Sequence, residues 1–239
     1  MLRKLYSQAG QDYWAIHDVF GGMRGGYFVD IGAADGKYIS NTYALERRFK
    51  WSGLCVEADP TSFEKLKKNR SCRCVNVCLD SEERDVVFTD GQGLYGGIVD
   101  DETDNASLSI PSRRIKTETL AAIMQRYNSP QTVHYLSVDV EGAEERVLAG
   151  FPFQTHRFLA ATIERPSRAL RQLLSGNGYL LVAEMPDLDA FYIHPSMKSS
   201  YTRRALIASQ ERSDNLVKRL ASYVTNSWRI GLRETISRM

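Results

Sequence analysis

Short apolar runs alternate with amphipathic segments along most of the chain. The apolar, β-branched runs predict strands over residues 27–31, 53–57, 73–79, 85–89, 134–140, 158–164, 179–184 and 190–194. Segments with helical spacing predict helices over 8–20, 43–49, 61–69, 119–127, 143–149 and 167–175, and the glycine-rich stretch 90–112 is expected to be a loop. This alternation predicts an α/β fold, with a mainly parallel sheet of about seven strands and helices on both faces. Such sheets bind ligands beyond the carboxyl ends of their strands.

The first predicted strand runs directly into the turn DIGAADG at residues 30–36. Glycines after a strand let the backbone approach a ligand closely, and the helix that follows offers free N–H groups. The spacing departs from the G-x-G-x-x-G turn of nicotinamide-binding folds, because Ala34 stands where the second glycine would be. The turn instead resembles the acidic-x-G-x-G-x-G pattern of S-adenosylmethionine (SAM) methyltransferases, with Ala34 in place of the middle glycine. A purely structural strand-to-helix turn is the alternative.

Glu57 ends the second predicted strand, 25 residues after Gly32. A carboxylate at this place can accept hydrogen bonds from both hydroxyls of a ribose, as in dinucleotide folds, where an acidic residue follows the glycine turn by about 20 residues. The glycine turn and Glu57 together therefore favour a nucleoside-containing cofactor.

Carboxylates also follow two later strands. Asp139 and Glu141 end one of them two residues apart, so both side chains can project to the same face, and Glu164 ends the next. Acidic groups at adjacent strand ends can serve as a general base or bind a divalent ion such as Mg²⁺, with Asp139 and Glu164 as the candidate ligands. The structural alternative is that Asp139 orders its loop and Glu164 pairs with Arg165.

The composition is that of an ordinary globular protein. The 239 residues are 43% hydrophobic and 25% charged, which excludes wholesale disorder and collagen-like or fibrous repeats. No apolar run approaches the roughly 20 residues of a membrane-spanning helix, and the first residues lack the apolar stretch of a secretory signal, so a cytoplasmic protein is expected. The four cysteines form no C-x-x-C pair and are expected to be small buried hydrophobes rather than metal ligands.

Charge is distributed unevenly along the chain. Residues 201–239 carry a net +5, whereas residues 1–200 carry −3. In this tail an apolar residue recurs every four positions, at Leu216, Leu220, Val224 and Trp228, which predicts a basic amphipathic helix appended to a domain over 1–200. We expect the apolar stripe to dock on the domain or on a second copy in a homodimer; contact with an anionic membrane surface and disorder are the alternatives. The acidic body argues against nucleic-acid binding.

Four segments together resemble the FkbM family of SAM-dependent methyltransferases. They are SQAGQD at 7–12, FVDIGA at 28–33, SNT at 40–42 and SVDVEGAE at 137–144, and they follow family-like order and spacing over residues 6–165. The last segment is a hallmark of the family. The resemblance implies a class I, Rossmann-like fold and O-methylation of hydroxyls on sugars, polyketides and other natural products.

The resemblance also implies roles for individual residues. SAM contacts, or positions close to the cofactor or its mouth, are implied for Gln8, Asp30, Gly32, Ala33, Asn41, Glu57, Asp80 and Ser137, with Asp80 near the adenine end. The N-terminal helix over 6–20, which carries Gln8 and Gln11, would fold over the site as a cap. Because an alcohol loses its proton during methyl transfer, a base is needed; Asp139 is the first candidate, with Glu141 and Glu164 behind it.

The sequence therefore predicts a SAM-dependent O-methyltransferase acting on a small-molecule or glycan hydroxyl. One alternative is a catalytically silent module that binds SAM and acts in assembly through its tail. A nicotinamide-dependent oxidoreductase is the other, and the missing G-x-G-x-x-G turn argues against it.

Overall fold

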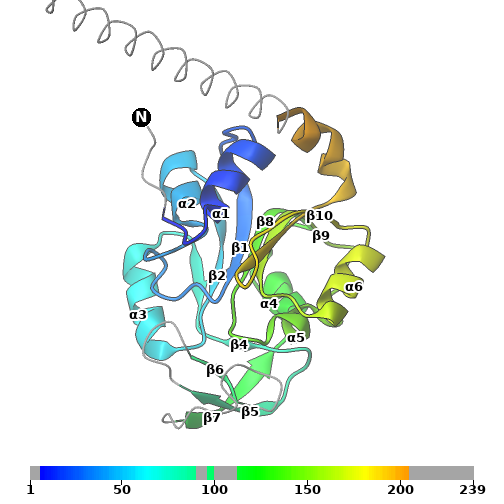
Figure 1. The fold of residues 1–239 in the computed structure, drawn as a ribbon. Coiled ribbons are helices and arrows are strands. Elements are labelled where there is room, and N and C mark those ends of the chain that lie inside the picture. Colours follow the sequence, from blue (N-terminus) through cyan, green and yellow to red (C-terminus); the bar gives the residue numbers. More distant parts are fainter. Residues whose placement is uncertain (1–5, 90–95, 100–111, 205–239) are drawn as a thin grey trace, which may run out of the picture. The chain divides into compact units, whose positions relative to one another are not determined.

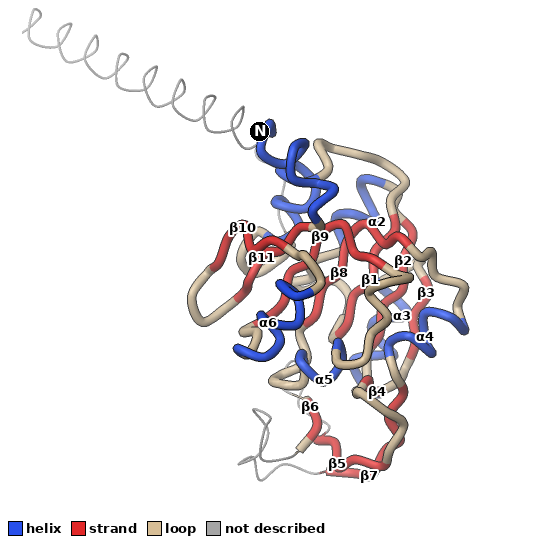
Figure 2. The backbone as a smooth tube through the Cα atoms, turned by 90° about the vertical axis from the view of Figure 1, so that its right-hand side faces the viewer, coloured by secondary structure: helices blue, strands red, loops and turns tan. Residues whose placement is uncertain are grey.

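A seven-stranded sheet forms the centre of the computed structural model, which describes residues 6–89, 96–99 and 112–204 (Figures 1 and 2). Its strand order is β10-β11-β9-β8-β1-β2-β3, and neighbouring strands are parallel except in the two pairs that involve β11. The strands are β1 (Tyr27–Ile31), β2 (Ser52–Val56), β3 (Arg73–Val75), β8 (Thr132–Val138), β9 (Arg157–Glu164), β10 (Leu180–Glu184) and β11 (Asp189–Ile193). The strand order reverses between β1 and β8, which is where such sheets bind their ligands.

Helices cover both faces of the sheet, as predicted (Figure 1). On one face, apolar side chains of α4 (Leu120–Arg126), α5 (Glu144–Leu148) and α6 (Arg168–Gly176) join those of the strands in one buried cluster. On the other face lie α2 (Tyr43–Phe49), α3 (Pro60–Asn69) and the N-terminal helices. A short 3-10 helix, η2 (Pro195–Met197), follows β11. The predicted α/β architecture is confirmed.

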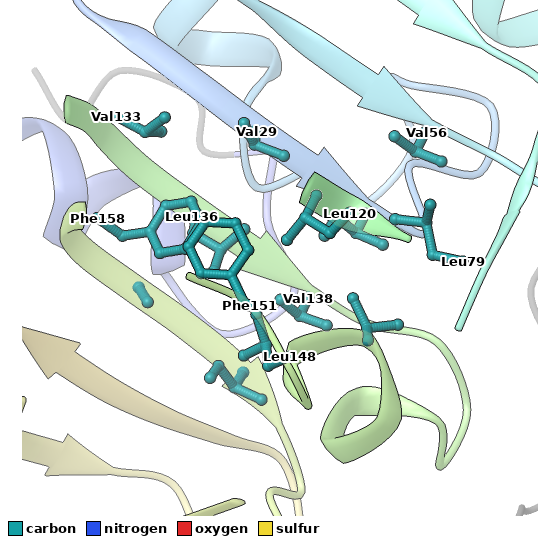
Figure 3. Packing of buried hydrophobic residues seen from close by; sticks show 14 of the residues in the cluster. Val29, Val56, Leu79, Leu120, Val133, Leu136, Val138, Leu148, Phe151 and Phe158 are labelled. Atoms are coloured by element: carbon teal, nitrogen blue, oxygen red, sulfur yellow. The ribbon is translucent and has the colours of Figure 1, made fainter. Parts of the chain in front are cut away.

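The core on the α4–α6 face combines strand residues such as Leu136 with helix residues such as Leu120 (Figure 3). Val29 of β1, Leu136 of β8 and Phe158 of β9 are at most 1% exposed. The rings of Phe151 and Phe158 stack with their centroids 5.0 Å apart. Burial of a large apolar side chain contributes roughly 1.5–3 kcal/mol, so this cluster fixes the strands whose ends carry the site.

A second, smaller sheet has the order β4-β7-β5-β6. It consists of β4 (Cys78–Leu79), β5 (Asp85–Thr89), β6 (Gly97–Ile98) and β7 (Ser112–Glu118). The single strand predicted over 73–79 is therefore wrong: β3 and β4 belong to different sheets. The loop predicted over 90–112 contains β6, and β7 follows it although its sequence, SRRIKTE, is mostly polar. Polar residues suit β7 because exposed and half-buried positions alternate along most of it.

The N-terminal helix differs from the one predicted. Helix α1 covers only Gln11–Tyr13 and continues as a π-helix, η1 (Trp14–Val19), in which the N–H of Phe20 donates to the carbonyl of Ala15 at 3.1 Å. The helix begins late because Gly10 has φ +82°. Trp14 nevertheless packs as its apolar position implies, edge-on against Phe191 of β11 with ring centroids 5.1 Å apart.

The chain divides into two compact units, Met1–Lys198 and Ser199–Met239. The amphipathic stripe predicted at 216–228 lies outside the described residues. Within the part of the chain that the structure describes, no helix combines the length and apolar character needed to cross a bilayer.

Candidate active site

A pocket of about 810 Å³ lies at the carboxyl ends of β1, β2, β8 and β9. Its walls are the turns after these strands, the β1–α2 loop, and residues of β5 and β6 in the second sheet. The predicted site residues that line it are Gln8, Asp30, Gly32, Ala33, Asn41, Glu57, Ser137, Asp139, Glu141 and Glu164. The structure thus brings these positions together around one cavity.

Gly32 lets the turn after β1 pass directly against the end of β8. Its φ is +78°, and a Cβ at this position would lie 1.7 Å from the carbonyl oxygen of Asp139. The N–H of Asp139 donates to the carbonyl of Ile31 and the N–H of Gly32 to that of Val56, each at 3.0 Å. Ala34, at the place of the middle glycine, has φ +47°, a conformation that costs an L-residue roughly 1–2 kcal/mol. The turn therefore keeps the backbone shape that the glycine pattern serves.

Glu57 follows β2, and two backbone groups fix its carboxylate beside this turn. Oε2 accepts from the N–H of Ala34 and Oε1 from that of Asp59, both at 2.7 Å. Burial raises the pKa of Glu57 to about 7, although the two N–H groups oppose the rise. A carboxylate held in this way keeps lone pairs for further donors, so vicinal hydroxyls of a ligand fit it.

A polar group lines the pocket where β1 and β8 lie side by side. Asn41 Nδ2 donates to Ser137 Oγ at 3.0 Å, whereas Asn41 Oδ1 is buried and has no donor among the described residues. Asp30 is 4% exposed and accepts a 2.5 Å hydrogen bond from the hydroxyl of Thr42. Buried acceptors without a donor are rare, so Asn41 Oδ1 marks a place where a ligand N–H would bind.

Behind Asp30 lies a buried arginine that the sequence pattern did not indicate. A guanidinium nitrogen of Arg70 is 3.8 Å from Asp30 Oδ2, and Arg70 Nε pairs more closely with Glu46 Oε2. Arg70 also donates to the hydroxyl of Thr42 at 2.9 Å. Charged residues near helix ends are exposed in most proteins, so the sequence carries no signal that Arg70 and Glu46 are buried.

Three carboxylates gather at the ends of β8 and β9. Asp139, Glu141 and Glu164 each bring one oxygen to within 4.8 Å of the others. Arg165 Nε is 3.2 Å from Glu164 Oε1, and a terminal nitrogen of Arg165 is 3.4 Å from Glu141 Oε2. Glu164 Oε2 is buried without a donor among the described residues. Burial, reinforced by Glu164 and Glu141, raises the pKa of Asp139 well above its usual range. Such a set can take up a proton or hold a cation.

The N-terminal segment reaches this same end of the sheet. Gln8 lines the pocket, and Gln11 Nε2 donates to Asp189 Oδ2 at 2.5 Å. Asp189 opens β11 and lies directly opposite Glu164 in the pairing of β11 with β9. Burial, together with the nearby Glu164, raises the pKa of Asp189 to about 6. Sequence reasoning missed Asp189, because its proximity depends on β11 inserting beside β9.

Asp80 is not among the residues that line the pocket. Its carboxylate accepts hydrogen bonds from Arg84 at 2.8 Å and from Arg146 at 2.9 Å. Burial raises its pKa, but these arginines outweigh burial and lower the pKa to about 2. Cys78 and Leu79 form the pocket wall here instead. The implied contact of Asp80 with adenine stays a prediction.

Backbone strain is concentrated around the pocket. Five of the seven non-glycine residues with positive φ in the described part of the chain line it, namely Ala34, Ile39, Glu141, Arg165 and Asp187. Ile39 is the most unusual, because a β-branched residue is a genuine outlier at φ +46°. Strained backbone of this kind gathers at ligand sites, which supports the pocket as the functional centre.

The sheet order and the pocket at the β1–β8 reversal define a Rossmann-like fold of the class I methyltransferase type. The methyltransferase FkbM domain family model matches residues 30–181, well over half of the chain. This protein belongs to that family.

No curated protein matches the sequence. Among solved structures, the METTL16 MTase domain is similar at 12% identity, over 81% of this chain and 69% of that chain, with a TM-score of 0.47. The N-terminal domain of human METTL16 in complex with SAH matches at 12% identity, over 81% and 72%, with a TM-score of 0.42. A methyltransferase from Pyrococcus furiosus matches at 13%, over 81% and 85%, with a TM-score of 0.38.

Proposed function

We propose that this protein is a SAM-dependent O-methyltransferase whose acceptor is a hydroxyl of a small molecule or glycan. Its family membership supports methyl transfer. The main observation in support of SAM as the cofactor is the order of chemical groups along the pocket. Following the sheet from β8 through β1 and β2 to β3, the lining changes from polar Ser137 and Asp30 to Glu57 and then to apolar Val77. SAM has the same order of parts: a charged amino-acid portion, a ribose and an adenine.

Individual groups fit these three parts. The unsatisfied Asn41 Oδ1 and the carboxylate of Asp30 suit the ammonium of the amino-acid portion. The fixed carboxylate of Glu57 suits the ribose hydroxyls. Val77, Phe88 and Ile98 also line the pocket, and apolar side chains of this kind suit the faces of an adenine ring.

The reaction asks the protein mainly for alignment and for removal of one proton. Bound SAM would supply a methyl group that its sulfonium already activates. The chain must hold the acceptor hydroxyl in line with that group, which is a positioning effect, and receive the hydroxyl proton. We assign Asp139 as the group that accepts this proton, because its raised pKa lets it hold a proton better than an ordinary carboxylate would. Arg165 holds the neighbouring Glu141 and Glu164 in place.

A divalent cation such as Mg²⁺ at Asp139 and Glu164 stays a prediction. Three oxygen ligands within reach of one ion support it, and the contact of Arg165 with Glu164 supports the structural alternative. Treatment with a chelator tests the site: metal dependence requires loss of methyl transfer that added magnesium restores, and unchanged transfer would exclude it.

Calorimetric titration of the purified protein with SAM tests the cofactor assignment. Asp30→Ala and Glu57→Ala should each weaken binding about tenfold or more, since each removes a charged hydrogen-bonding group. Glu64→Ala, a change on the exposed face of α3, should leave affinity unchanged. Absence of SAM binding up to millimolar concentrations would overturn the proposal.

Transfer of labelled methyl from SAM into an extract of the source organism tests catalysis and identifies the acceptor. A labelled methyl ether is expected. Tight binding of SAM with no labelled product would favour the silent SAM-binding module, and a labelled amine or thioether would contradict O-methylation.

A further inference from the structure

A buried set of three charges lies behind the polar end of the pocket. Arg70, Asp30 and Glu46 are 5%, 4% and 7% exposed. Each comes from a different part of the fold: Arg70 caps the C-terminus of α3, Asp30 lies in β1, and Glu46 lies in α2. Charged side chains are buried this deeply almost only when they are paired, so the set has a defined arrangement.

The pairing within this set is uneven. Arg70 Nε contacts Glu46 Oε2 directly, whereas its nearest contact to Asp30 is 3.8 Å. The N–H groups of Ser71 and Cys72 donate to the other oxygen of Glu46, at 2.6 and 3.1 Å, and hold it against the arginine. Arg70 is thereby drawn toward Glu46 and away from Asp30.

Only Asp30 of the three lines the pocket. Two carboxylates share one guanidinium, so the set carries one net negative charge, and Asp30 is the member that can present it to a ligand. Burial raises the pKa of Asp30, and the guanidinium of Arg70 opposes that rise; without Arg70 the pKa would rise further, and the protonated form of Asp30 would be favoured. Without Glu46, the guanidinium would act on Asp30 alone and cancel its charge.

We propose that Arg70 and Glu46 are positioning residues that set the charge of Asp30 toward a cationic ligand: Arg70 favours the ionised form of Asp30, and Glu46 keeps Arg70 from neutralising that charge. The proposal rests on the proposed function, because the ligand is the amino-acid portion of SAM with its ammonium and sulfonium. The other groups that face Asp30 are the hydroxyls of Thr42 and Ser137, the thiol of Cys72 and the phenol of Tyr135. The hydroxyls of Thr42 and Ser137 donate to Asp30 and favour its ionised form, whereas the thiol of Cys72 opposes it.

Two ligands separate this role from a general structural one. SAM carries the charged amino-acid portion, and 5′-methylthioadenosine keeps the adenosine and lacks that portion. Arg70 also donates to the carbonyl of Gly36 at 3.2 Å in the β1–α2 loop. A variant that only disturbs this loop should therefore lower the affinity for both ligands together. A defect in the charge of Asp30 should weaken SAM alone. We would measure both affinities by calorimetry between about pH 6 and pH 9, for the wild type, Arg70→Met, Arg70→Lys and Glu46→Gln.

In Arg70→Met, SAM affinity should fall about tenfold or more near pH 6 and approach the wild-type value near pH 9, because the pKa of Asp30 rises and one pKa unit is worth about tenfold. In Glu46→Gln, SAM affinity should fall about three- to tenfold at every pH, without a shift in pH dependence. Arg70→Lys should keep most of the affinity, since it keeps the charge. At each pH, the affinity of every variant for 5′-methylthioadenosine should stay within about threefold of the wild-type value.

An equal loss of affinity for both ligands in Arg70→Met and Glu46→Gln would overturn the proposal. Unchanged SAM affinity in both variants would overturn it as well. If Arg70→Met fails to fold, Glu46→Gln with the two ligands still decides the matter. A wild-type protein that binds neither ligand would instead overturn the proposed function, so the two failures are distinguishable.

Discussion

Gly32 meets two requirements of the turn after β1: a positive φ and a close approach to the backbone of β8. Replacing Gly32 by alanine, with Gly22→Ala as the matched control, should separate the two. The two glycines have nearly the same φ, +78° and +79°, so an alanine at either place is disfavoured by roughly 1–2 kcal/mol. They differ in their surroundings. A Cβ on Gly32 would lie 1.7 Å from the carbonyl oxygen of Asp139, whereas a Cβ on Gly22 has nothing within 4 Å.

Side-chain rotation cannot relieve the overlap at Gly32, because the atom it meets belongs to the backbone. The turn must move away from β8, which disrupts the hydrogen bond from the N–H of Asp139 to Ile31. A forced backbone shift costs about 1–3 kcal/mol and the lost hydrogen bond about 1 kcal/mol. Gly32→Ala should therefore lower the free energy of unfolding by about 3–6 kcal/mol, and Gly22→Ala by about 1–2 kcal/mol.

Urea unfolding of the two variants and the wild type measures these differences. Because 1 kcal/mol corresponds to about 2–4 °C in a domain of this size, thermal unfolding should show the same order. SAM affinity should fall in Gly32→Ala alone, since only that change displaces the pocket lining. Equal destabilisation of the two variants would refute the reasoning, because it would mean that the close approach of the turn to β8 does not exist in solution.

Three further predictions concern the carboxylates. Protonation of Glu57, whose pKa is about 7, should weaken SAM binding about tenfold between pH 8 and pH 6, as measured by calorimetry. In Glu57→Gln the SAM affinity should depend much less on pH. An equally steep pH dependence in the variant would show that Glu57 is not the titrating group. Since the folded-state pKa of Asp80 is lowered to about 2, its pairing stabilises the protein above pH 4 and is lost as pH falls through 2. Asp80→Asn should therefore lower the free energy of unfolding by about 2–3 kcal/mol at pH 7. The difference in free energy between the variant and the wild type, measured by urea unfolding, should become smaller toward acid pH. Asp139→Asn should reduce methyl transfer about a hundredfold while SAM affinity changes little. Full activity of this variant on an identified acceptor would contradict the assignment of Asp139 as the general base.

The sequence was most informative where a single position determines the local structure. The places of Gly32 and Glu57 at the pocket were predictable because a turn that approaches another strand needs glycine and the side chain at the end of a strand faces the pocket. The helix over residues 43–49 was predicted with the bounds that α2 has in the structure. Asp139 and Glu164 meet because parallel strands end at one edge of the sheet, which the alternation of elements already implies.

Features that depend on distant partners were not predictable in this way. Arg70 is buried because it meets Glu46, Asp30 and Thr42, which come from three other segments of the chain. Strand β7 was missed because its mostly polar sequence has no apolar face that a pattern could reveal. The break between β3 and β4 was missed because an apolar run does not show that its two halves join different sheets.

The junction of the first helices with the last strand constrains how the protein can be made. Gln11 and Asp189 are 178 positions apart, yet their hydrogen bond and the packing of Trp14 on Phe191 join the N-terminal segment to β11. During synthesis, this side of the domain stays open until residue 193 has left the ribosome, and such long-range contacts slow folding. A shortened chain that covers only residues 30–181, the stretch matched by the family model, would lack both partners and leave β9 with an unpaired edge. Its expected fate is aggregation.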